Sequence, residues 1–186
     1  MTDGDGDGGG AGAGPPRRQL EGLLTGFDFY VHRERLRDDD RLVREWACHA
    51  LADAADAVRR VESALRRAIP SPTPHEPMPP AQDLGRLRDI GNLYRAVSDA
   101  EALVRAQPYP HTDRIWGRLR NEEALLELVL EHDLSLINAA EAVRAAAEAL
   151  SAAPESGALT AVQRALDRCE RALAERAFAL DLSAGS

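Results

Sequence analysis

The chain has 186 residues, 44% of them apolar, and a net charge of −8, and all 23 of its basic residues are arginine. This apolar content excludes a wholly disordered chain, and no apolar run approaches the roughly 18 residues that span a bilayer. The negative charge disfavours general nucleic-acid binding, and two distant cysteines, Cys48 and Cys169, cannot form a disulfide framework.

The chain begins with a segment rich in glycine and aspartate, residues 1–16. Such residues lose much conformational entropy on ordering and bury little apolar surface, so we predict a disordered tail here. The segment has neither the basic start nor the apolar core of a secretory signal. Together with the two cysteines, this favours a cytoplasmic protein. We expect residues 17–182 to form a single helical-bundle domain.

Apolar residues at a spacing of three and four predict a first helix over residues 17–37. Aspartates at 38–40 follow, and because aspartate is a good N-cap we predict a break there and a second helix over 41–69. This second helix carries the clearest pattern in the chain. One seam repeats at intervals of four and three, and a second, parallel seam repeats at intervals of seven: Ala47, Leu51, Ala54, Val58, Val61, Leu65 and Ala68; Val43, Ala50, Ala57 and Ala64. Such seams are typical of helices that pack lengthwise.

Six prolines between residues 70 and 80 predict an extended linker, 70–82, inside the domain. Beyond it we predict helices over 83–106, with Asp83 as its cap, and over 121–150, with Asn121 as its cap. A short helical turn begins at Thr112 or Asp113, and a last helix covers 159–180. No segment has the strict alternation of a strand.

Each predicted helix has one apolar stripe and one charged face, so the stripes must be buried against one another. The fold class is therefore all-α, an elongated antiparallel bundle of four to five helices with coiled-coil-like packing. We expect the two longest helices, 41–69 and 121–150, to form its frame. The clean stripes favour a non-enzymatic protein–protein interaction or scaffold module, whose partner is another protein or a second copy. We expect no cofactor.

One position departs from this pattern, because Asp133 interrupts the apolar stripe of the helix over 121–150, beside His132. A buried carboxylate is costly unless it is paired. One interpretation is a small-ligand sensor in which His132 and Asp133 line an internal polar pocket. The simpler interpretation, which we favour, is that the helix turns at 132–135 and places Asp133 at the rim, near an arginine.

Arg44 and His49 form an arginine–four residues–histidine pattern. This spacing resembles the motif of the HEPN family, all-α nucleases in which arginine and histidine from two subunits face a phosphate. The resemblance covers six residues and implies a ribonuclease with Arg44 and His49 as catalytic residues. Arginine would stabilise phosphate charge, and histidine would move a proton near neutral pH. The alternative, which we favour, is a surface arginine and a half-buried histidine on a packed helix.

Two further patterns concern charge and metal. The pairs Arg59–Arg60 and Arg66–Arg67 lie seven residues apart and form a basic patch, which is either a solvated helix face or a dock for an acidic partner. We favour the solvated face. The five histidines are scattered, and no two lie four apart on a predicted helix, so we predict no metal site.

Overall fold

The computed structural model describes residues 16–32, 35–69, 78–107 and 113–184. Within these ranges the chain forms six helices and no strand, which confirms the all-α prediction. The helices are α1 (Pro16–Leu23), α2 (Leu36–Ala68), α3 (Ala81–Ala106), α4 (Asp113–Asn121), α5 (Glu123–Ala152) and α6 (Ser156–Ala184). Most of the predicted N-terminal tail (1–15) and of the proline-rich linker (70–77) lies outside the described residues.

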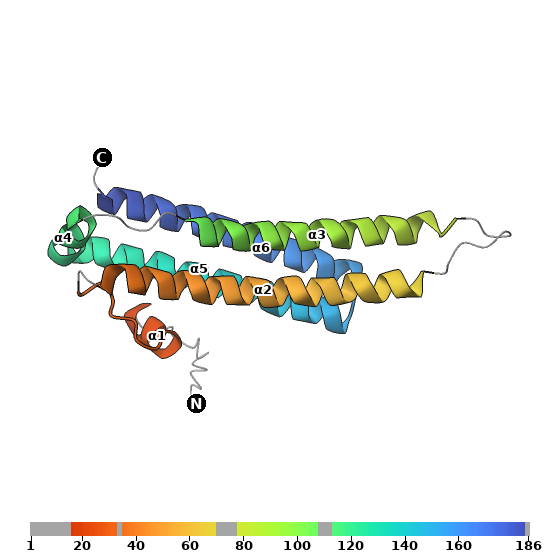
Figure 1. Cartoon of the computed structure of the whole chain (residues 1–186), viewed down its shortest axis with the longest axis horizontal. Helices are drawn as coiled ribbons and strands as arrows, with labels where there is room; N and C mark the ends of the chain where they lie inside the picture. The colour runs from red at the N-terminus through yellow and green to blue at the C-terminus, as the bar shows by residue number, and fades with distance from the viewer. Residues whose placement is uncertain (1–15, 33–34, 70–77, 108–112, 185–186) are drawn as a thin grey trace, which may run out of the picture.

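Two antiparallel helical hairpins, α2–α3 and α5–α6, lie side by side and make an elongated bundle (Figure 1). The hairpins meet mainly through α2 and α5, while the contact between α3 and α6 is much less extensive. These central helices are the two that the sequence predicts as the frame. The short helix α4 lies where the second hairpin begins, and α1 packs against α5 (Figure 1).

The core follows the predicted seams closely. On α2, both seams are buried from Val43 as far as Val61. On α5, every position of the stripe from Val129 to Leu150 is buried, and Leu126 is half-buried. Burying one large aliphatic side chain is worth about 1.5–3 kcal/mol, so the long stripes account for the lengthwise packing of the hairpins.

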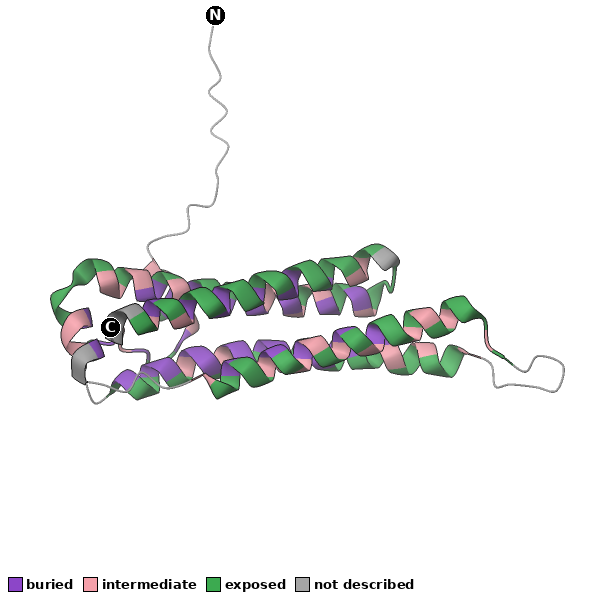
Figure 2. Ribbon diagram, turned by 90° about the horizontal axis from the view of Figure 1, so that it is seen from above, coloured by how far each residue is buried: buried purple, intermediate pink, exposed green. Residues whose placement is uncertain are grey.

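The two hairpins differ in reach, because α2–α3 projects beyond the turn that joins α5 to α6 (Figures 1 and 2). We call this the distal end, consisting of residues 61–68, 81–90 and 151–155. The opposite end, where α1 and α4 lie, is the proximal end. Exposed residues dominate the projecting part of the α2–α3 hairpin (Figure 2).

The prediction of one helix over 17–37 is wrong. Helix α1 ends at Leu23, and α2 begins at Leu36. Between them, Gly26, Phe29 and Tyr30 have φ angles of 85°, 55° and 58°. These left-handed conformations cannot continue a right-handed helix. Leu24, Phe27 and Tyr30 of this stretch are nevertheless buried, whereas Val31 is 48% exposed. The three–four spacing of the buried residues therefore reflects contact with the core and not helical structure.

Three predicted helix starts also differ from the structure. The N-cap of α2 is Arg35, without a side-chain cap bond, so the aspartates at 38–40 lie inside the helix. Asn121 ends α4, and the N-cap of α5 is Glu122. Helix α3 follows Pro80, with Asp83 in its first turn. Acidic residues in a first turn still stabilise the positive end of the helix dipole.

Candidate functional site

Asp133 lies in the core, with an exposed fraction of 0%. Helix α5 continues without a break through residues 132–135, so the expected turn is absent and the placement of Asp133 at the rim is wrong. The expected arginine is present, however. Arg176 on α6 donates from Nε to Oδ1 of Asp133 at 2.7 Å, and the hydroxyl of Tyr30 donates to Oδ2 at 2.6 Å. His132, the other residue of the pair, is half-buried.

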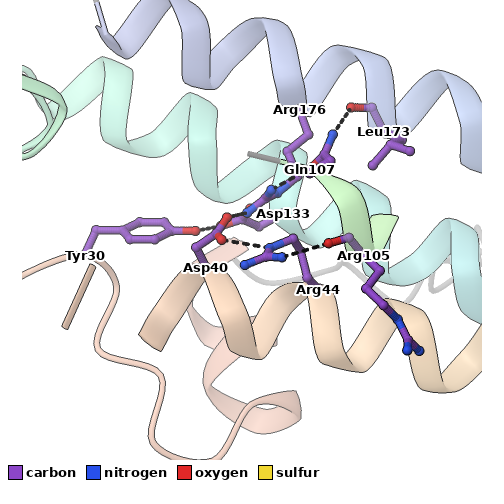
Figure 3. A network of polar contacts seen from close by, with 8 residues as sticks. All are labelled: Tyr30, Asp40, Arg44, Arg105, Gln107, Asp133, Leu173 and Arg176. Carbon is purple, nitrogen blue, oxygen red and sulfur yellow. Dashed lines mark hydrogen bonds and ion pairs between the residues drawn. The ribbon is translucent and has the colours of Figure 1, made fainter. Parts of the chain in front are cut away.

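Arg176 joins three elements of the fold through one guanidinium group (Figure 3). Besides its bond to Asp133, it donates from Nη2 to Oδ1 of Asp40 at 2.8 Å and from Nη1 to Oε1 of Gln107 at 3.1 Å. Arg176, Asp40 and Asp133 are each 0% exposed. The planar guanidinium offers five N–H donors in a fixed geometry, which suits it to hold several acceptors at once.

Arg44 completes the arrangement from the side of α2. It donates from Nε to Oδ2 of Asp40 at 2.8 Å and from Nη1 to the carbonyl of Arg105 at 3.4 Å. We call Tyr30, Asp40, Arg44, Asp133 and Arg176 the buried polar cluster (Figure 3). Its two carboxylates face two guanidinium groups, and such pairing is what makes burial of charge tolerable.

The electrostatics of the cluster follow from its burial. Burial raises the pKa of Asp133 above its ordinary value, although Arg176 and the Tyr30 hydroxyl oppose this. Burial also disfavours the charged form of Arg176, but the Asp133 and Asp40 carboxylates outweigh it and raise the pKa of Arg176. Burial and Asp133 place the pKa of Tyr30 well above 10.0. At neutral pH, Tyr30 is therefore a protonated donor and Arg176 a permanent cation.

The N-terminal segment, residues 24–32, is held against the proximal end by backbone bonds. The Asp39 carboxylate accepts N–H bonds from Asp28 and Tyr30, both at 2.8 Å. The ring of Phe27 contacts Phe29 and Tyr30 edge to face, with centroid distances of 5.0 and 5.5 Å. Left-handed conformations at non-glycine residues cost about 1–3 kcal/mol each. The bonds to Asp39 and Asp133 offset this strain.

Sequence reasoning singled out Asp133 and Arg44 but missed Arg176 and misassigned Asp39 and Asp40 as caps. A signal for Arg176 exists, because the apolar stripe of α6 continues through it. Cys169, Leu173, Arg176 and Leu180 are spaced four, three and four apart, so they lie on one helix face.

Arg44 and His49 line the same open groove between α2 and α3, which has a volume of about 520 Å³. Their exposure is the reverse of what we expected. Arg44 is only 6% exposed and His49 is exposed. The guanidinium of Arg44 binds Asp40 and the Arg105 carbonyl, so the donors that a phosphate would need are directed into the protein.

A second groove, the distal groove, begins where α5 ends. Its volume is about 430 Å³, and its lining comes from α2, α3, the last turn of α5 and the α5–α6 turn: Arg60, Val61, Ala64, Leu65, Ala68, Arg86, Ile90, Ser151 and Pro154. Arg86 crosses from α3 to the turn, where its Nη2 donates to the carbonyl of Pro154. An adjoining groove of about 820 Å³ between α3 and α6 shares Arg86, Ile90 and Pro154 with it.

No three His, Cys, Asp or Glu side chains in the described ranges converge as metal ligands would. None of the helices described is both long and apolar enough to cross a membrane. Comparison with models of known protein families, with curated proteins and with solved structures found no significant match.

Proposed function

We propose that the protein is a non-enzymatic binding module that packs a helix of another protein against its distal end. One observation carries this proposal: the apolar seam of α2 is longer than its cover. The seam repeats unchanged to Ala68, yet its residues are buried only as far as Val61. Leu65 is half-buried, and Ala64 and Ala68 are exposed.

Helix α3 has the same imbalance. Its stripe is buried from Ile90 to Val104, apart from the half-buried Tyr94, but Leu87 is half-buried and Leu84 is 38% exposed. A single exposed leucine is ordinary in a soluble protein. It is unusual, however, for two antiparallel helices both to continue their core-facing stripes beyond the core. Such continuous apolar surface is typical of interaction sites. An added helix in the distal groove would continue the bundle by the packing that already joins α2 to α5.

The buried polar cluster supports a structural role for the residues that were candidates for chemistry. Both oxygens of Asp133 accept bonds from the protein itself, and the Arg44 guanidinium is held by Asp40. A sensor would need Asp133 to face a ligand, and a ribonuclease would need Arg44 to face a phosphate. A rigid scaffold that presents a surface needs neither.

Site-specific photo-crosslinking in the organism that makes the protein tests this proposal. A benzophenone amino acid replaces Ala68 in the distal groove or, as the control, the exposed Glu127 on α5. We expect a discrete covalent protein adduct from position 68, lost when Leu65→Asp is added, and none from position 127. Absence of an adduct at position 68, or an equal yield at both positions, would refute the proposal.

A further inference from the structure

Resting on the proposed function, we infer that the partner is an amphipathic helix with acidic residues beside its apolar stripe. The segment 59–68 of α2 carries four arginines and one glutamate, a local charge of +3 in a chain whose net charge is −8. The lining of the distal groove holds two arginines, Arg60 and Arg86, and no acidic residue. Elsewhere at the distal end, Asp83, Asp89 and Glu155 offset the other arginines.

The arginines are placed as a rim around the apolar floor. Arg60 from α2 and Arg86 from α3 line opposite sides of the groove whose floor includes Val61, Leu65 and Ile90. Arg67 lies seven residues after Arg60, which places it on the same flank of α2 two turns further on. An occupant that follows the floor along α2 thus passes two guanidinium groups that are two turns apart.

Little of this positive charge is neutralised by the chain itself. Arg66 pairs with Glu62 at 2.7 Å, and the Glu62 carboxylate, which is 20% exposed, lies toward Gly91 of α3. Within the ranges that the structure describes, Arg59, Arg60 and Arg67 form no ion pair with a carboxylate. Carboxylates on an incoming helix would supply the missing counter-charge and would also speed its association.

The same charges disfavour a second copy as the occupant. A two-fold symmetric contact brings each surface patch against itself. Two distal grooves packed face to face would bring the arginines that line one groove, Arg60 and Arg86, close to those that line the other. Like charges in contact cost several kcal/mol in an interface. An acidic amphipathic helix would instead pack apolar side chains on the floor and pair its carboxylates with the arginines of the rim.

The dimensions indicate how much of a helix the groove would take. Residues 61–68 of α2 extend about 10 Å at about 1.5 Å per residue, which is two helical turns. A partner would therefore place three or four apolar side chains on the floor, at positions i, i+3, i+4 and i+7. Acidic residues would flank this stripe, above Arg60 on one side and Arg86 on the other.

Fluorescence anisotropy with synthetic helical peptides tests the inference on the full-length protein. The three peptides are about 18 residues long, about five helical turns, with the same leucine stripe and with Glu, Gln or Lys in the flanking positions. We expect the Glu peptide to bind at least about tenfold more tightly than the Gln peptide at low salt, with the difference reduced by added salt. The Lys peptide should bind more weakly than both.

Charge reversal in the protein provides the matched test. Arg60→Glu combined with Arg67→Glu should weaken the Glu peptide at least about tenfold and strengthen the Lys peptide. The control is Arg168→Glu with Arg171→Glu on the exposed face of α6, which should change neither. Circular dichroism and thermal melting confirm that both variants remain folded.

Three results would overturn the inference: no binding of the Glu peptide up to about 1 mM, equal affinity for the Glu and Lys peptides, or an equal loss in the α6 control. Light scattering that shows a dimer dissociated by Leu65→Asp would also overturn it, by assigning the groove to a second copy. These failures are separate from failure of the proposed function. A crosslinked partner at position 68 without a preference for acidic peptides rejects only the acidic chemistry, and absence of any crosslink rejects both.

Discussion

Replacement of Arg176 by methionine is the sharpest test of the buried polar cluster. In the folded protein, Arg176 binds two carboxylates, Asp40 at 2.8 Å and Asp133 at 2.7 Å, and all three side chains are fully buried. Methionine is unbranched like the arginine stem and fills irregular space in a core. The Arg176→Met substitution therefore removes one positive charge from the cluster and preserves much of the packing.

The expected magnitude follows from the charge balance. Two carboxylates and two guanidinium groups balance in the wild-type protein, whereas Arg176→Met leaves one buried carboxylate without a counter-ion. Removal of one partner of a buried ion pair costs about 3–5 kcal/mol. For a protein of this size, about 2–4 °C of melting temperature corresponds to 1 kcal/mol. The variant should therefore melt about 6–20 °C lower.

Replacing Tyr30 and Asp133 together with Arg176 should recover much of the lost stability. The triple variant Tyr30→Phe, Asp133→Leu, Arg176→Met leaves only the Asp40–Arg44 pair, which is balanced. Replacement of a whole buried ion-pair network by apolar residues is often neutral or stabilising. The triple variant should therefore be more stable than Arg176→Met alone, despite carrying two more substitutions.

Urea denaturation at neutral pH measures these differences, and unchanged m-values confirm that the same transition is compared. The control is Arg144→Met, because Arg144 also binds two carboxylates, Glu141 and Glu148, but at the surface of α5. Exposed ion pairs contribute about 0–1 kcal/mol. A loss below about 1 kcal/mol for Arg176→Met, or a triple variant no more stable than the single one, would refute the cluster as the source of stability.

Three further predictions concern the backbone, the thiols and pH. Gly26→Ala should destabilise the protein by about 1–2 kcal/mol, because φ is +85° at this position. Gly22→Ala inside α1 should stabilise it by about 0.5–1 kcal/mol, because the new Cβ would have no atom within 4 Å. Melting temperatures that shift in the same direction for both variants would contradict this prediction. Burial raises the pKa of the Cys48 thiol, and it raises the pKa of the Cys169 thiol to about 11. A thiol reagent near pH 8 should therefore label both cysteines only after unfolding. Rapid labelling of the native protein would contradict this prediction. Because the folded-state pKa of Asp133 is raised, the folded protein takes up this proton before the unfolded chain does. The wild-type protein should therefore gain stability relative to Asp133→Asn as the pH falls toward the ordinary aspartate pKa of about 4. A difference that shrinks on acidification would disprove the assignment.

The seams of α2 and α5 could be predicted because their periodicity is local and long. A pattern of intervals of four and three that repeats over twenty residues admits one regular structure. The stretch after α1 could not be predicted in the same way. Leu20, Leu24, Phe27 and Tyr30 have helical spacing and are buried, but tertiary contacts hold the last two in a non-helical segment. Gly22 near the end of α1 and Gly26 after it were the local sign against a long helix.

The partners in the buried polar cluster are beyond the reach of local patterns. Arg176 lies 43 residues from Asp133 and 136 residues from Asp40 in the chain. A charged residue on an apolar stripe signals that a counter-charge is needed, but only the packed fold supplies its identity. The distal groove could not be predicted from the sequence for a related reason. Each seam is visible in the sequence, whereas its cover depends on where the neighbouring helix ends.

These two features are connected through the axial register of the helices. Alanine seams repeat every seven residues with little difference in side-chain shape, so they permit α2 to slide along α5 by about 10 Å, the length of one repeat. Arg176 permits no such movement, because it must reach Asp40 on α2 and Asp133 on α5 together. A buried polar group that fixes register at some cost in stability is known from coiled coils.

The triple variant separates register from stability. If the cluster sets the register, the variant should stay folded but lose a unique alignment of α2 and α5, and with it the defined distal groove. Spin labels at the exposed positions Ala64 and Ala149 report that alignment. The wild-type protein should give one narrow distance distribution, and the triple variant a broader one or a second distance shifted by up to about 10 Å. One narrow, unchanged distribution in the variant would show that the apolar seams alone determine how far the α2–α3 hairpin projects.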